Sequence, residues 1–375
     1  MTKEEEKKQL ATLEIMRHRA VELPAKAITL GFDGFIDSVV KVIKQKDLKS
    51  DPSYFESTQA FGEYIVEKGQ KSFSIELEEL TNKLGGNMPI MANALACMGP
   101  QVSCIGPLGY PDIHPVFRHM SPNCHLHSFA NPGLSKVLEF NSGKIMLAEM
   151  TGLNHISWDF IKEIVGIDTF LRLFTKSDLI ALLNWSELDN STAIWQGLLT
   201  DVLPKSVSSK KPIGFFDLSD CSKRGGQSIR EAMELVKAFS VYWNVVLSLN
   251  LNEATLVHAV LSDTKQREED IEEICEEIFS ILNIHTVIIH SAKQSIARNS
   301  DGFYSRKSFF IDEPTISSGA GDNFNAGFCI GKLMDLEPGT CLSMGNASSS
   351  LYMNSARSPA VAEVVEFLSH NLASL

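Results

Sequence analysis

Short apolar runs alternate with helix-length amphipathic stretches along most of this 375-residue chain. Strands that are apolar on both faces are typical of a parallel sheet that helices cover on both sides. The alternation therefore predicts an α/β fold with a mostly parallel central sheet. The runs that read as its strands are residues 27–32, 179–183, 213–216, 242–247 and 286–289.

Two regions interrupt this alternation, one near residues 38–50 and the other at 124–150. Both contain short stretches with the period-two pattern of strands, so we expect them to form a small β lid. A charged amphipathic segment at the start predicts an N-terminal helical extension over residues 1–23. With no internal repeat or low-complexity linker, residues 24–375 are expected to form one domain.

The composition limits the classes of partner. A net charge of −12 and the lack of a basic, aromatic-rich patch argue against nucleic acid and anionic membranes. No run of about 18 apolar residues and no signal-peptide core is seen, so we expect a cytoplasmic chain. Seven cysteines, an odd number in a long chain, favour reduced thiols.

One cluster has the residue types of a metal site, namely His119, Cys124, His125 and His127. It lacks a second spaced pair such as C-x-x-C, which structural zinc sites use. We therefore expect no bound zinc and no site that holds a metal with protein ligands alone.

The most specific motif is the sequence S-S-G-A-G-D-N-F-N-A-G-F over residues 317–328. The amides of Gly319, Ala320 and Gly321 can converge on an anion at the start of the apolar helix that follows. Asp322 would oppose that anion unless it takes a proton from an attacking hydroxyl group. The spacing fits neither the dinucleotide fingerprint nor the P-loop, and a plain strand-to-helix turn is the structural alternative.

Three further groups of polar residues and glycines lie next to apolar runs. Open α/β sheets bind ligands at the carboxyl ends of their strands. The carboxylates suit hydrogen bonds to hydroxyl groups, and the glycine pair would let a ligand approach the backbone. An Asx turn, a plain helix start and a helix capping box are the respective structural alternatives. The groups are Asp33 with Asp37, Gly85 and Gly86 with Asn87, and Asn250 with Glu253.

In this order, the four motifs resemble those of the ribokinase-like (PfkB) carbohydrate kinase family over residues 28–368. Residues 318–328 match its signature G-A-G-D-x-F-x-x-G-F. The resemblance implies a three-layer α/β/α fold with a small β lid, Asp322 as catalytic base and residues 319–321 as the anion hole. It assigns sugar binding to Asp37, Gly85, Gly86 and Asn87, with Asp33 as an additional candidate.

The resemblance also implies a nucleotide and magnesium-phosphate site. Asn250, Glu253 and Asn346 match positions of this kind. The family's T-x-G-x-x-G segment is replaced by H-S-A-K-Q-S at residues 290–295, where Ser291 and Lys293 become the candidate phosphate contacts.

We therefore expect ATP-dependent phosphorylation of a hydroxyl group of a sugar or related small polyol, with Mg²⁺ and room for a monovalent cation. The altered segment keeps two alternatives open: a nucleoside kinase, and a catalytically weak sugar- or nucleotide-binding regulator on the same scaffold. Exposed lid edges often pair between subunits, so a homodimer through the lid and a monomer both remain open.

Overall fold

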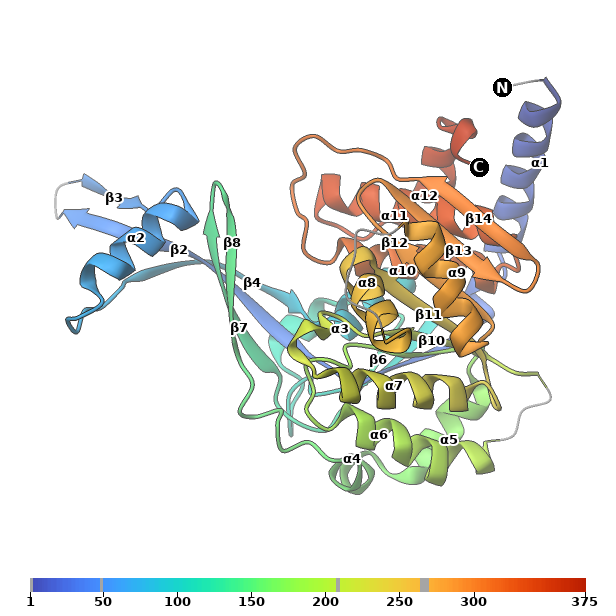
Figure 1. Cartoon of the computed structure of the whole chain (residues 1–375), viewed down its shortest axis with the longest axis horizontal. Coiled ribbons are helices and arrows are strands. Elements are labelled where there is room, and N and C mark those ends of the chain that lie inside the picture. Colours follow the sequence, from blue (N-terminus) through green and yellow to red (C-terminus); the bar gives the residue numbers. More distant parts are fainter. Residues whose placement is uncertain (1–2, 48–49, 207–209, 264–269) are drawn as a thin grey trace.

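The computed structural model describes residues 3–47, 50–206, 210–263 and 270–375. Within these ranges, nine strands form one large sheet (Figure 1). All neighbouring pairs from β12 to β6 run parallel, whereas β13 and β14 add an antiparallel hairpin at one edge. The predicted, mostly parallel sheet is thus confirmed. In sheet order its strands are β14 (Gly302–Lys307), β13 (Gln294–Asn299), β12 (Thr286–His290), β11 (Asn244–Asn250), β10 (Ile213–Asp217), β9 (Leu179–Leu182), β1 (Ala27–Gly31), β5 (Gln101–Gly106) and β6 (Cys124–Ser128).

Helices cover both faces of this sheet and bury a separate apolar core on each side. This gives the three-layer α/β/α arrangement. One face carries α4 (Trp158–Val165), α5 (Ile167–Lys176), α6 (Ser191–Gly197), α7 (Gly226–Phe239), α8 (Leu251–Leu261) and α9 (Ile271–Leu282). The other carries α1 (Lys3–Ala20), α3 (Asn87–Cys97), α10 (Ala320–Leu333), α11 (Pro338–Ser355) and α12 (Val361–Ser369). Short turns of other helix types are η1 (Leu23–Ala25), η2 (Pro115–His119), η3 (Leu198–Val202), η4 (Leu203–Lys205), η5 (Cys221–Lys223) and η6 (Leu372–Ser374).

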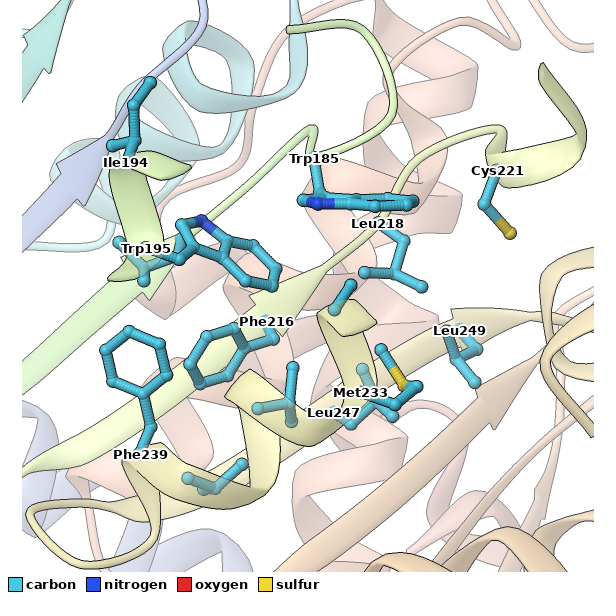
Figure 2. Close-up of a cluster of buried hydrophobic side chains, with 14 of the residues drawn as sticks. Trp185, Ile194, Trp195, Phe216, Leu218, Cys221, Met233, Phe239, Leu247 and Leu249 are labelled. Atoms are coloured by element: carbon cyan, nitrogen blue, oxygen red, sulfur yellow. The ribbon is translucent and has the colours of Figure 1, made fainter. Parts of the chain in front are cut away.

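Aromatic side chains fix the middle of the sheet against the α6–α7 layer (Figure 2). The rings of Trp195 and Phe216 meet edge to face at 5.2 Å, and those of Phe216 and Phe239 lie 5.1 Å apart. Each such pair adds about 0.5–1.5 kcal/mol beyond the burial of apolar area. Because Phe216 precedes the last residue of β10, this packing holds the carboxyl end of that strand.

Two glycines bring α10 and α11 unusually close. A Cβ atom at Gly327 would lie 2.6 Å from the carbonyl oxygen of Met344, and one at Gly331 would lie 2.9 Å from the Cα atom of Cys341. No side chain fits at such distances, so these positions require glycine. The close approach fixes α11 along the second half of α10.

A second, smaller sheet extends away from the main body, at the left of Figure 1. It has its own apolar core, which includes Val40, Val42 and Phe140 together with Phe61 from α2. The elements are β2 (Phe35–Asp47), β3 (Ser50–Tyr54), β4 (Leu77–Gly85), β7 (Gly133–Phe140), β8 (Gly143–Glu149) and α2 (Thr58–Lys68). The small sheet contains most of the two segments in which we expected a lid.

The lid boundaries differ from the expectation in two ways. The segment 124–128 is strand β6 of the large sheet, because it pairs with β5 rather than with β7. Strand β4 belongs to the small sheet but was not predicted, since its residues are mostly exposed and give no apolar signal. Residues 48–49, which belong to the first expected lid segment, and residues 267–269 lie outside the described residues.

The expected N-terminal helix forms as α1, and its Leu13 and Met16 are buried in the same core as α10 to α12. Within the described ranges, no helix is long and apolar enough to cross a membrane.

Candidate active site

Two cavities border the start of α10, and one of them lies at the carboxyl ends of the parallel strands β11 and β12. Cavity A, of about 990 Å³, is lined by the small sheet and the main body, including Asp37, Lys83, Ser318 and Tyr352. Cavity B, of about 560 Å³, is lined by Asn250, His290, Phe310, Gly321 and Asn346 among others. Ser317 and Ser318 line cavity A, whereas Ala320 and Gly321 line cavity B, so successive residues of one turn border the two cavities.

The turn itself has the geometry of an anion site. Gly319 precedes α10 with φ +87°, and a Cβ atom there would lie 2.9 Å from the hydroxyl oxygen of Tyr352. The amide of Ala320 donates to the carbonyl oxygen of Ser317, whereas those of Gly321 and Asp322 have no acceptor among the described residues. Free amides at the start of a helix attract negative charge.

Asp322 lies in the first turn of α10 with only 7% of its surface exposed. Burial raises the pKa of this carboxyl well above its usual range, and the negative charges of Asp217 and Asp33 add to the effect. A hydrogen bond from the side chain of Asn87 partly offsets it. Asp322 directly follows residues that line the two cavities, and a carboxylate with a raised pKa at such a place is suited to accept a proton.

Asp217, which our sequence reasoning missed, is buried at the end of β10. Its carboxylate accepts hydrogen bonds from the backbone amide of Ser219 at 2.8 Å and from the Asn325 side chain at 2.7 Å. Asn325 in turn accepts a bond from the Ser248 hydroxyl at 2.7 Å, which connects β10 and β11 to α10. The signal was available, because Asp217 directly follows a predicted central strand.

Asp33, expected as an additional sugar ligand, holds the start of a helix through hydrogen bonds. Its carboxylate accepts hydrogen bonds of 2.8 Å from the backbone amides of Asn87 and Met88 and from the Asn184 side chain. With 0% exposure it holds the start of α3, which brings Asn87 to Asp322. Gly86 makes this possible, since a Cβ atom there would lie 2.4 Å from the Asp33 carboxylate.

Asp37, by contrast, lines cavity A from strand β2. It is 4% exposed, yet it accepts no hydrogen bond from any described residue. Burial raises its pKa to about 6, and the positive charges of Lys83 and Lys144 limit the rise. A buried carboxylate without a donor at a cavity wall is poorly solvated, so a ligand hydroxyl group would satisfy it.

Cavity B is lined by polar, aromatic and aliphatic residues, and Asp, Glu, Lys and Arg are absent from this lining. Asn250 and Glu253 form a reciprocal capping box at the start of α8, which is the structural alternative for this motif. Asn250 still lines the cavity, as does Asn346, whose amide donates to the Lys307 carbonyl oxygen at 3.2 Å.

The altered segment after β12 makes a tight turn. The Ser291 hydroxyl donates to the carbonyl oxygen of Gln294 at 2.9 Å, so its proton is already used, although Ser291 lines cavity B. Lys293 lies outside the lining of both cavities. The ring of His290 packs on that of Phe324 with centroids 4.8 Å apart, and burial lowers the pKa of His290 to about 4.

The described residues contain no group of three or more His, Cys, Asp and Glu side chains that could hold a metal ion. Two carboxyl groups nevertheless influence each other. Burial and then the charge of Asp217 raise the pKa of Glu253 well above its usual range. Repulsion between two carboxyl groups favours the binding of a cation near them, and ligands other than protein side chains would complete the coordination of that cation.

Comparison with known proteins places the chain among sugar kinases. A family model described as prokaryotic ketohexokinase matches residues 5–371. The ketohexokinase of Haloferax volcanii is 25% identical over 347 residues, which cover 91% of this chain and 90% of that protein.

Solved structures share the fold at low identity. The ribokinase of Thermotoga maritima is 15% identical with a TM-score of 0.62, over 92% of this chain and 99% of its own. A mutant of Escherichia coli phosphofructokinase-2 is 14% identical with a TM-score of 0.56, over 93% and 99%. The adenosine kinase of Sinorhizobium meliloti is 12% identical with a TM-score of 0.63, over 92% and 99%.

Proposed function

Because the chain belongs to the prokaryotic ketohexokinase family, we propose that it transfers the γ-phosphoryl group of ATP to a hydroxyl group of a ketohexose. The resemblance to ribokinase-like carbohydrate kinases is confirmed, and the chain is a phosphotransferase with an alcohol acceptor. The observation that supports this proposal is the position of Asp322, a buried carboxyl in the first turn of α10, directly after residues that line cavity A and cavity B.

In the proposed reaction, the sugar occupies cavity A and its hydroxyl group faces Asp322. The carboxylate orients that hydroxyl group and accepts its proton as the oxygen attacks the γ-phosphorus atom. The Asn87 side chain, which hydrogen-bonds to Asp322, keeps the carboxylate in place. The free amides of Gly321 and Asp322 then stabilise the negative charge on the transferred group.

ATP would occupy cavity B, whose uncharged lining leaves phosphate recognition to amides and hydroxyl groups. Exposed Phe310 offers apolar surface to a base. This arrangement does not require the phosphate contact that we expected of Lys293.

Magnesium fits the acidic surroundings of Asp217 and Glu253, whose mutual repulsion a cation would relieve. Both Glu253 oxygens accept hydrogen bonds from Asn250, at 2.9 Å from its amide and 2.6 Å from its side chain. Bridging waters would therefore connect Glu253 to the ion. When bound, magnesium neutralises charge on the phosphate oxygens of ATP.

The test is ADP release measured with ketohexoses, aldohexoses, sugar acids and nucleosides as acceptors. We expect a ketohexose to be the best acceptor, and Asp322→Asn to lower turnover by roughly 100-fold or more while ATP binding stays near that of the unaltered protein. Asp335→Asn is a matched control, because Asp335 is exposed beyond the other end of α10 with φ +54°, which asparagine adopts readily.

Unchanged turnover of Asp322→Asn would refute the assignment of the base. A nucleoside as the best acceptor would replace the proposed substrate. Absence of both ADP release and ATP binding at millimolar concentration would favour a regulator built on the kinase scaffold.

A further inference from the structure

Three polar side chains form a row across the small sheet. In the strand register, Lys83 of β4 lies opposite Asp37 of β2, and Asp37 lies opposite Ser135 of β7. Residues directly opposite on neighbouring strands point to the same face of a sheet. Asp37 and Lys83 both line cavity A, so this is the face that meets the acceptor.

The side chains of this row have no hydrogen-bond or ion-pair partner among the described residues. Lys83 forms no ion pair or hydrogen bond with a described residue. It is nevertheless close enough to Asp37 for its positive charge to limit the rise in the pKa of that carboxyl that burial causes. The Ser135 hydroxyl oxygen is buried and likewise has no partner within the described ranges. A structural ion pair would bring Lys83 and Asp37 into contact, whereas here both side chains line cavity A without pairing with each other.

A second lysine near Asp37 is a weaker candidate. Lys144 also lines cavity A, but its register partner on β7 is Glu139, which lines the same cavity and supplies a counter-charge. Lys144 is also exposed, in contrast to the half-buried Lys83. The cation aligned with the sugar ligand Asp37 is therefore Lys83.

We propose that Lys83 determines acceptor specificity by donating a hydrogen bond to one oxygen of the sugar while Asp37 accepts from a neighbouring hydroxyl group. The two side chains then recognise a pair of adjacent oxygens, either a vicinal diol or a hydroxyl group next to a carbonyl. An ammonium group only donates and a carboxylate only accepts, so the pair orients the sugar as well as binding it. This inference rests on the proposed sugar kinase function.

The experiment compares the best ketohexose with its singly deoxygenated analogues, for the unaltered protein and for Lys83→Met. The substitution keeps the length and apolar stem of the side chain and removes the charged donor. We expect kcat/KM for the full sugar to fall about 10- to 150-fold, as for a hydrogen bond to a charged group. We also expect Lys83→Met to lose the preference for the full sugar over one particular deoxy analogue.

Lys136→Met is the matched control. Lys136 is next to Ser135 on β7, so it points to the opposite face, where it donates to the Ser38 hydroxyl at 2.8 Å. It should leave both kcat/KM and the preference unchanged.

If Lys83→Met keeps the preference of the unaltered protein for every oxygen of the sugar, the inference is wrong. Equal losses in Lys83→Met and Lys136→Met would assign Lys83 a merely structural role and would also overturn it. If instead the unaltered protein phosphorylates no sugar at all, it is the proposed function that fails.

Discussion

Gly85 offers a direct test of the sugar site, because it lies next to Asp37 but does not itself line cavity A. A Cβ atom at this position would lie 2.3 Å from one carboxylate oxygen of Asp37 and 2.7 Å from its Cγ atom. Contacts below about 3 Å are not tolerated, so Gly85→Ala must turn the carboxylate away. The backbone of Gly85 is not in the left-handed region, so alanine adds no strain of its own.

Displacement of Asp37 should remove one hydrogen bond between a charged group and the sugar, which is worth about 1.5–3 kcal/mol. This corresponds to a loss of about 10- to 150-fold in kcat/KM for the sugar. The KM for ATP should stay unchanged, because Asp37 lies on the wall of cavity A and not of cavity B.

The assay is steady-state ADP release with the sugar and ATP varied in turn, accompanied by a thermal melt to verify folding. Gly62→Ala provides the control, since nothing lies within 4 Å of a Cβ atom there and alanine favours the helix α2. A kcat/KM for the sugar that stays within about twofold of the unaltered value in a folded Gly85→Ala protein would refute the placement of Asp37 in the sugar site.

Two predictions concern pH. The pKa of Asp37 is about 6 in the folded chain against 3.8 ordinarily, so its ionisation lowers stability as pH rises between these values. Asp37→Asn should therefore raise the free energy of unfolding by up to about 3 kcal/mol at about pH 8 and by little at about pH 4. Urea denaturation at the two pH values measures this difference. An equal increase at both pH values would contradict the prediction. Turnover should fall on acidification with an apparent pKa above the ordinary range of a carboxyl. Because the charge of Asp217 raises the pKa of Asp322, Asp217→Asn should move this acidic limb of the pH–rate profile to lower pH. An acidic limb that stays at the same pH in Asp217→Asn would argue against Asp322 as the base.

The difference between Asp33 and Asp37 illustrates what sequence reasoning could not resolve. Both carboxylates follow the same strand and stand four residues apart, so their chemistry alone does not separate them. The family resemblance favours Asp37 and leaves Asp33 as an additional candidate. In the structure, the backbone amides at the start of α3 donate hydrogen bonds to Asp33, whereas Asp37 lines cavity A. Which carboxylate lines the cavity therefore depends on helix α3, whose first residue, Asn87, comes 54 residues after Asp33 in the chain.

Local chain chemistry determined the part of the site that could be recognised in advance. The turn before α10 follows from its own residues, because glycine at 319 permits the left-handed conformation and the apolar run after Asp322 continues as a buried helix. The apolar runs likewise determined the large sheet, since strands covered on both faces need no polar alternation.

The tertiary structure alone decided which distant groups meet. Lys83 and Asp37 are neighbours only through the pairing of β4 with β2, and β4 carries no apolar pattern from which that pairing could be inferred. Asp217 acts on Asp322 only because the fold places β10 next to α10, where Asn325 donates a hydrogen bond to Asp217. Charge interactions and cavity walls depend on distance in space, whereas sequence patterns report distance along the chain, and the fold alone relates the two.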